Sequence, residues 1–65
     1  MKRRDLVRLI LQHDCVLDHE GGRHTVFVNP SNHRTSSVPR HNEIKNGLAR
    51  KICSDLGIPD PFRRN

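Results

Sequence analysis

Residues 15–28, CVLDHEGGRHTVFV, decide the fold. Apolar residues lie on both sides of the pair Gly21-Gly22, and glycine pairs in this position are typical of the tight turn between two strands. Residues 15–19 therefore predict a first strand, and residues 24–28 predict a second. Together they predict a β-hairpin.

The second strand ends where turn-forming residues begin. The period of two places Val26 and Val28 on one face of this strand. Residues 29–32, Asn-Pro-Ser-Asn, then predict a second reversal of the chain, since proline cannot donate to a strand ladder. Residues 34–38 follow as a short third strand, which Pro39 closes.

The segment before the hairpin, residues 2–13, predicts an amphipathic helix. The residues that recur on one stripe at helical spacing are Leu6, Leu9, Ile10 and His13. The first turn holds three basic residues, which oppose the positive end of the helix dipole. This placement indicates either a ligand-binding role or a plain solvated face.

A second amphipathic helix is predicted after the third strand. Its apolar residues repeat every fourth position and are Ile44, Leu48, Ile52 and Leu56. Gly47 disfavours the helix interior and is expected in the first turn or at a close helix contact. Gly57 and Pro59 provide a stop signal at the carboxyl end.

The resulting order is helix, three antiparallel strands, helix, which is an α+β fold. Two helices bury their apolar stripes most economically when both lie on one face of the small sheet. This α-β-β-β-α layout is similar to the double-stranded-RNA-binding domain. We expect one domain over residues 1–65, with residues 58–65 as a flexible C-terminal tail.

Charge and composition restrict the class of partner. Twelve Lys and Arg against seven Asp and Glu give a net charge of +5, which favours a polyanionic partner. No apolar run approaches the roughly 20 residues of a membrane span. We therefore expect a soluble, cytoplasmic protein without a membrane partner. Cys15 and Cys53 are far apart and are expected to be packed, reduced thiols.

His24 is the candidate catalytic residue. The five histidines show no metal-ligand spacing, so neither a metal nor another cofactor is expected. His24 follows Gly21-Gly22-Arg23, where glycines allow close approach of a phosphate and Arg23 supplies a fixed cation. Histidine transfers protons near neutral pH, as RNA cleavage through the 2′-hydroxyl requires. Whether His24 would act as acid or base stays open, as does its proton partner.

Three motifs in this order resemble the HicA toxin family. They are Gly21-Gly22-Arg23-His24-Thr25, the segment VPRHNEIKNG at residues 38–47, and Ala49-Arg50-Lys51-Ile52. The likeness spans nearly the whole chain, from the first helix to residue 58. The resemblance implies an mRNA-cleaving endoribonuclease, or mRNA interferase, that inhibits translation and growth in a bacterial or archaeal cytoplasm.

The resemblance also implies a site and a partner. His24 matches the motif histidine and inherits the catalytic role. We expect the RNA-binding residues to be Gly22, Arg23, Lys2, Arg4, Arg40 and Lys45. A cognate HicB-type antitoxin is expected to form a hetero-oligomer with the chain and to cover His24. Two alternatives are a noncatalytic double-stranded-RNA-binding module and a structural or regulatory protein that binds DNA or an acidic partner.

Overall fold

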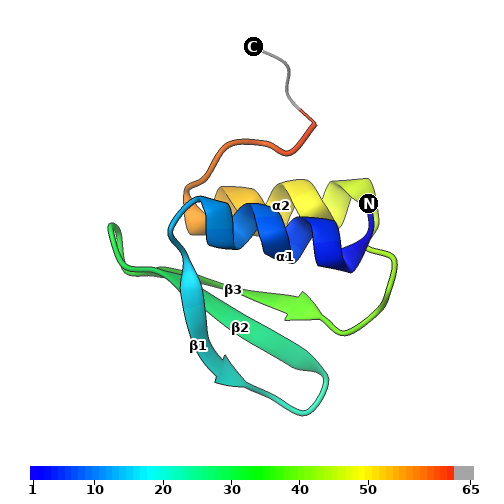
Figure 1. Ribbon diagram of the computed structural model, residues 1–65, viewed down its shortest axis with the longest axis horizontal. Coiled ribbons are helices and arrows are strands. Elements are labelled where there is room, and N and C mark those ends of the chain that lie inside the picture. The colour runs from blue at the N-terminus through cyan, green and yellow to red at the C-terminus, as the bar shows by residue number, and fades with distance from the viewer. Residues whose placement is uncertain (63–65) are drawn as a thin grey trace.

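The computed structural model describes residues 1–62 and confirms the predicted α+β layout (Figure 1). The elements in chain order are α1 (Arg3–Gln12), β1 (Val16–Glu20), β2 (His24–Asn29), β3 (Arg34–Pro39) and α2 (Asn46–Leu56). Both helices lie on the same face of the sheet. No helix in this described part is long and apolar enough to cross a membrane.

The three strands form an antiparallel sheet in the order β1-β2-β3. Strand β1 begins at Val16 and ends at Glu20, one residue later at each end than the sequence predicted. The pairing of β1 with β2 is irregular between Leu17 and His19, so that Asp18 is an extra residue in the edge strand. Strands β2 and β3 pair without interruption, from His24 opposite Pro39 to Asn29 opposite Arg34.

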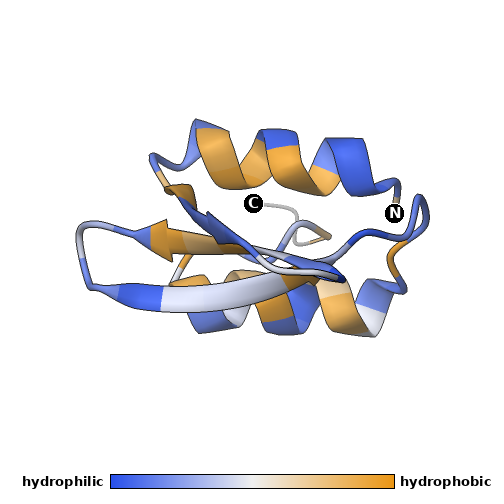
Figure 2. Cartoon of the chain, turned by 90° about the horizontal axis from the view of Figure 1, so that it is seen from below, coloured by the Kyte–Doolittle hydropathy of each residue, from blue (hydrophilic) through white to orange (hydrophobic). Residues whose placement is uncertain are grey.

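The two faces of β2 have different environments. Thr25, Phe27 and Asn29 are buried beneath the helices. Val26 and Val28 therefore face the other side, which neither α1 nor α2 covers when the sheet is seen from below (Figure 2). Val16 lies directly opposite Val28 and shares this open face with 47% of its surface exposed.

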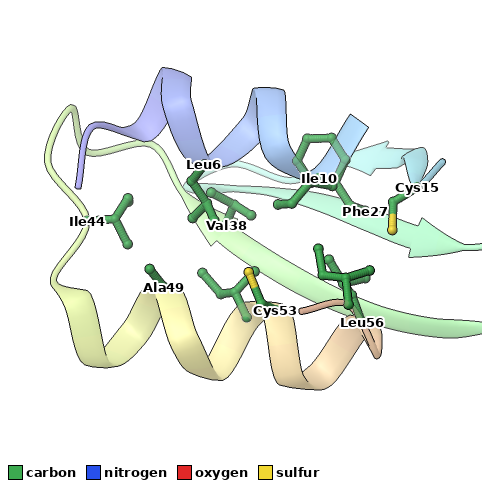
Figure 3. Close-up of a cluster of buried hydrophobic side chains, with 11 residues drawn as sticks. Leu6, Ile10, Cys15, Phe27, Val38, Ile44, Ala49, Cys53 and Leu56 are labelled. Carbon is green, nitrogen blue, oxygen red and sulfur yellow. The ribbon is translucent and has the colours of Figure 1, made fainter. Parts of the chain in front are cut away.

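The core lies between the sheet and the two helices (Figure 3). The buried apolar residues are Leu6, Ile10, Cys15, Phe27, Val38, Ile44, Ala49, Ile52, Cys53, Leu56 and Ile58. Leu9 is only partly buried against this cluster, and His13 is exposed, so the buried stripe of α1 is narrower than the sequence predicted. Both cysteines are free and buried, as expected.

One prediction about the buried residues of α2 was wrong. Leu48 is 39% exposed, although the fourfold repeat placed it among the buried residues. In a helix of 3.6 residues per turn, each residue lies about 40° further around the axis than the residue four positions earlier. Residues at this spacing therefore do not all stay on the face that packs on the core. The buried positions follow the true helical period and are Ala49, Ile52, Cys53 and Leu56. Ile44 lies before the helix, and Gly47 lies in its first turn.

The β2–β3 loop caps the carboxyl end of α2. Gly57 adopts φ 71°, and an added Cβ would lie 2.6 Å from Asn32 Nδ2, so another residue would be strained there and would displace the Asn32 amide. The side-chain amides of Asn29 and Asn32 both donate to the Leu56 carbonyl, at 2.9 and 3.1 Å. These contacts fix the helix end against the sheet.

Part of the predicted flexible tail, residues 58–65, packs on the domain. Ile58 is only 8% exposed and belongs to the core. Phe62 packs against the core, and the Arg50 guanidinium lies 5.2 Å from the centre of its ring. Residues 63–65 lie outside the described residues.

Candidate nucleic-acid interface

Three segments that are distant in sequence meet at one end of the molecule (Figure 1): the β1–β2 turn, the loop after β3 and the start of α1. The backbone N–H of Arg40 donates to the Arg23 carbonyl at 3.3 Å, and that of Arg3 donates to the Asn42 carbonyl at 2.8 Å. All seven residues predicted for the site lie in these segments or directly beside them. The tertiary structure therefore gathers the predicted set at one end, which we call the basic end.

His24 is the first residue of β2 and is exposed. Its backbone is fixed, because it pairs with Pro39 and its carbonyl accepts a hydrogen bond from the Gly21 N–H at 2.8 Å. No residue in the range 1–62 forms a hydrogen bond with its imidazole ring. The strand end that carries the ring is thus fixed, and both ring nitrogens are available to a ligand.

The turn before His24 leaves room for a ligand. A Cβ added at Gly22 would meet nothing within 4 Å, so the surface beside this residue is open. A Cβ at Gly21 would lie 3.2 Å from the His24 carbonyl oxygen, so that glycine permits the close turn instead. Gly22 is therefore the position where a phosphate backbone can approach closely.

The cations of the basic end fall into two groups. Arg4, Arg23 and Lys45 are exposed and form no ion pair with any carboxylate of the described chain. Lys2 and Arg40 are each paired. Glu43 and Glu20 pair with Lys2 and Arg40, so the three unpaired cations leave this end with a net positive charge.

Arg40 has a structural role as well as a charge. Its guanidinium contacts the Glu20 carboxylate and donates to the Gly21 carbonyl at 2.9 Å. These contacts connect the loop after β3 to the β1–β2 turn. Glu20 partly neutralises Arg40, which therefore offers less free charge than Arg23.

Lys2 lies beside Glu43, with 3.5 Å between Nζ and Oε1. The same carboxylate accepts a hydrogen bond from the amino group of Met1 at 2.6 Å, and this bond lowers the pKa of Glu43 below its ordinary value. The start of α1 is thereby attached to the segment that leads into α2. The isolated bridge between Lys2 and Glu43 makes the same connection through the backbone.

Arg3 also belongs to this end, although it was not among the residues predicted for the site. Its Nε donates to the Pro39 carbonyl at 2.9 Å, and its Nη2 donates to Thr25 Oγ1 at 2.9 Å. Both acceptors flank His24, one opposite it and one directly after it. The signal was present in the sequence, because Arg3 falls on the same helical stripe as the buried Leu6 and Ile10.

The other histidines are dispersed. His19 pairs with Val26 rather than with His24, and its Nδ1 lies 2.7 Å from Asp18 Oδ2. His41 is exposed in the loop between Arg40 and Asn42. Across residues 1–62, no three His, Cys, Asp or Glu side chains form a group that could hold a metal ion.

Comparison with known proteins identifies the family. No curated protein and no solved structure showed significant similarity to the chain. A family model described as "HicA toxin of bacterial toxin-antitoxin" matches residues 3–58, which include every helix and strand found in residues 1–62. With most of its length matched, the chain belongs to the HicA family of toxins from bacterial toxin–antitoxin systems.

Proposed function

We propose that this protein is an endoribonuclease that cleaves mRNA with His24 as its catalytic residue, and that cleavage inhibits translation and growth. Membership in a toxin family supports a growth-inhibiting activity. The observation that carries the proposal is the exposed His24 ring at a fixed strand end, next to the open turn and the unpaired Arg23. A protein that acts on mRNA in this way works in the bacterial or archaeal cytoplasm.

The proposed reaction is an intramolecular transfer at phosphorus. The 2′-oxygen of the RNA attacks the adjacent phosphorus, a 2′-O–P bond forms, and the P–O5′ bond breaks. One proton leaves the 2′-hydroxyl and one proton reaches the departing 5′-oxygen, so the products are a 2′,3′-cyclic phosphate and a 5′-hydroxyl. An imidazole can perform either proton transfer near neutral pH.

The residues around His24 would bind the RNA backbone. Arg23 is the cation nearest to His24 in sequence and has no acidic partner in the described chain, so it would contact the scissile phosphate. Gly22 would let the backbone approach. The remaining predicted contacts to phosphates are those of Lys2, Arg4, Arg40 and Lys45, with Arg40 weakened by its pairing to Glu20.

Incubation of the purified protein with single-stranded RNA in excess EDTA tests this proposal. We expect shorter RNA products that end in 2′,3′-cyclic phosphates. A noncatalytic RNA-binding module would instead shift the mobility of the RNA without shortening it. Intact RNA after incubation with folded protein would overturn the cleavage proposal and favour that alternative.

The partner would be an acidic HicB-type antitoxin that covers His24. The open face of the sheet supports this proposal, because it carries an apolar strip. The strip begins at Val26, two residues after His24, and continues to Val28 and its partner Val16 at the far end of the strands. Protein interfaces combine an apolar centre with a charged rim, and an acidic partner would add charge neutralisation to steric block. A structure of the inhibited complex with His24 still accessible to solvent would contradict this mode of inhibition.

A further inference from the structure

A cavity of about 400 Å³ lies at the start of α1, apart from the His24 ring. The residues that line it are Lys2, Arg3, Arg4 and Asn42. Three of the four side chains are cations, and the fourth offers an amide. No acidic side chain in the described chain lines this cavity, so its chemistry suits an anion. Figure 2 shows the same region as the hydrophilic first turn of α1.

Arg3 is held in a fixed orientation within this cavity. Its Nε and Nη2 donate to the Pro39 carbonyl and to Thr25 Oγ1, and Thr25 is itself only 5% exposed. These two bonds use the side edge of the guanidinium. The outer edge, with one N–H from each terminal nitrogen, has no partner in the described chain and matches two oxygens of a phosphate group.

Lys2 and Arg4 supply further positive charge at the same cavity. Arg4 is exposed and forms no ion pair with residues 1–62. Lys2 lies 3.5 Å from Glu43, whose charge the Met1 amino group already satisfies in part. Because the orientation of Arg3 is fixed before a ligand arrives, little side-chain entropy is lost when an anion binds.

The cavity and His24 lie on opposite sides of the same strand end. Thr25 faces the helices and contacts Arg3, whereas successive residues of a strand alternate, so His24 faces the other way. Arg3 also contacts Pro39, which is directly opposite His24. An RNA strand that presents one phosphate to His24 can therefore continue around the strand end and place another phosphate in the cavity.

We propose that this cavity binds a phosphodiester of the RNA backbone other than the scissile one, with Arg3 as its oriented bidentate donor. This inference rests on the proposed function only in taking RNA as the ligand. Arg3 is a positioning residue for the substrate strand, and it needs no part in the proton transfers at His24.

The test measures binding of a single-stranded RNA oligonucleotide as a function of salt, in a His24→Ala background that prevents cleavage. Arg3→Gln and Arg4→Gln are the variants, and Arg8→Gln is the matched control. Arg8 belongs to the same helix, carries the same charge and is 69% exposed, but it does not line the cavity. Circular dichroism and thermal unfolding check the fold of each variant.

We expect each cavity variant to lower the slope of log affinity against log salt by about 0.7, the value for one lost phosphate contact to a single strand. When salt rises from 50 to 200 mM, the affinity of a cavity variant for RNA should therefore fall about 2.6-fold less than that of the background protein. Arg8→Gln should leave the slope unchanged. Arg4 makes no contact that maintains the fold, so its variant remains decisive if Arg3→Gln unfolds.

Equal slopes for Arg4→Gln, Arg8→Gln and the background protein would overturn the proposal. An unchanged RNA slope together with weaker antitoxin binding would also overturn it and assign the cavity to the protein partner. The cleavage assay is independent of this result. RNA that is bound through the cavity but never cut would remove the nuclease proposal and leave the phosphate site standing.

Discussion

Replacement of His24 by alanine should separate catalysis from folding. The His24 side chain is exposed, and its ring has no hydrogen-bond partner in the described chain. Its removal therefore opens no cavity and leaves no buried polar group unsatisfied. The free energy of unfolding should change by no more than about 0.5 kcal/mol, as for other exposed positions without special contacts.

The same substitution should greatly slow RNA cleavage. A positioned proton donor or acceptor typically contributes a factor of about 10² to 10⁴ to the rate. We therefore expect cleavage by His24→Ala to fall by that factor, which corresponds to about 2.7–5.5 kcal/mol in the activation free energy. RNA affinity should change far less, because the cations of the basic end remain.

The assay follows the cleavage of end-labelled RNA in EDTA and the unfolding of the same samples by urea. His13→Ala is the matched control. His13 is also exposed, but it lies at the C-cap of α1, away from the residues of the basic end. This control should match the wild type in both measurements. A folded His24→Ala protein that cleaves RNA at the wild-type rate would refute the catalytic assignment.

Three further predictions concern stability and the buried thiols. Asn29→Ala removes a donor to the Leu56 carbonyl and should lower the free energy of unfolding by about 1–3 kcal/mol in urea titrations; an unchanged midpoint would show that the cap contributes nothing. Burial raises the pKa of Cys53 to about 11, so a thiol reagent at pH 8 should label neither buried cysteine until denaturant is added; rapid labelling of native protein would contradict this burial. The hydrogen bond from Lys51 lowers the pKa of Asp55 in the folded state below its ordinary value. The ionised carboxylate therefore stabilises the fold at pH values above its unfolded-state pKa, and this stabilisation is lost as the pH falls through the folded-state pKa. Asp55→Asn should therefore flatten the decline of stability in acid, and a parallel decline in both proteins would argue against this linkage.

The sequence by itself determined the order of elements and the position of the candidate catalytic residue. Local spacing was sufficient, because the Gly21-Gly22 turn, the period of two in the strands and the stop at Gly57 depend on residues that are near in the chain. The same locality placed His24 at the start of β2. The sequence also shows that the basic residues lie in a few short segments.

The choice between the faces of each element depended on tertiary packing. A period of two shows that Val26 and Val28 share a face, but the helices cover the face of Thr25 and Phe27 instead. The fourfold repeat in α2 likewise included Leu48, which the drift of the helix turns toward solvent. Both outcomes depend on how elements that are distant in the chain meet.

The tertiary structure alone gave Arg3 its place beside His24. The stripe of Leu6 and Ile10 indicates that Arg3 lies on the core side of α1, but it does not indicate which groups Arg3 contacts. The acceptors of Arg3 are the Pro39 carbonyl and Thr25 Oγ1, which are 36 and 22 residues away in the chain. Contacts over such separations form only when α1 docks on the sheet. That docking places the Arg3 guanidinium at the start of β2, where His24 is the first residue.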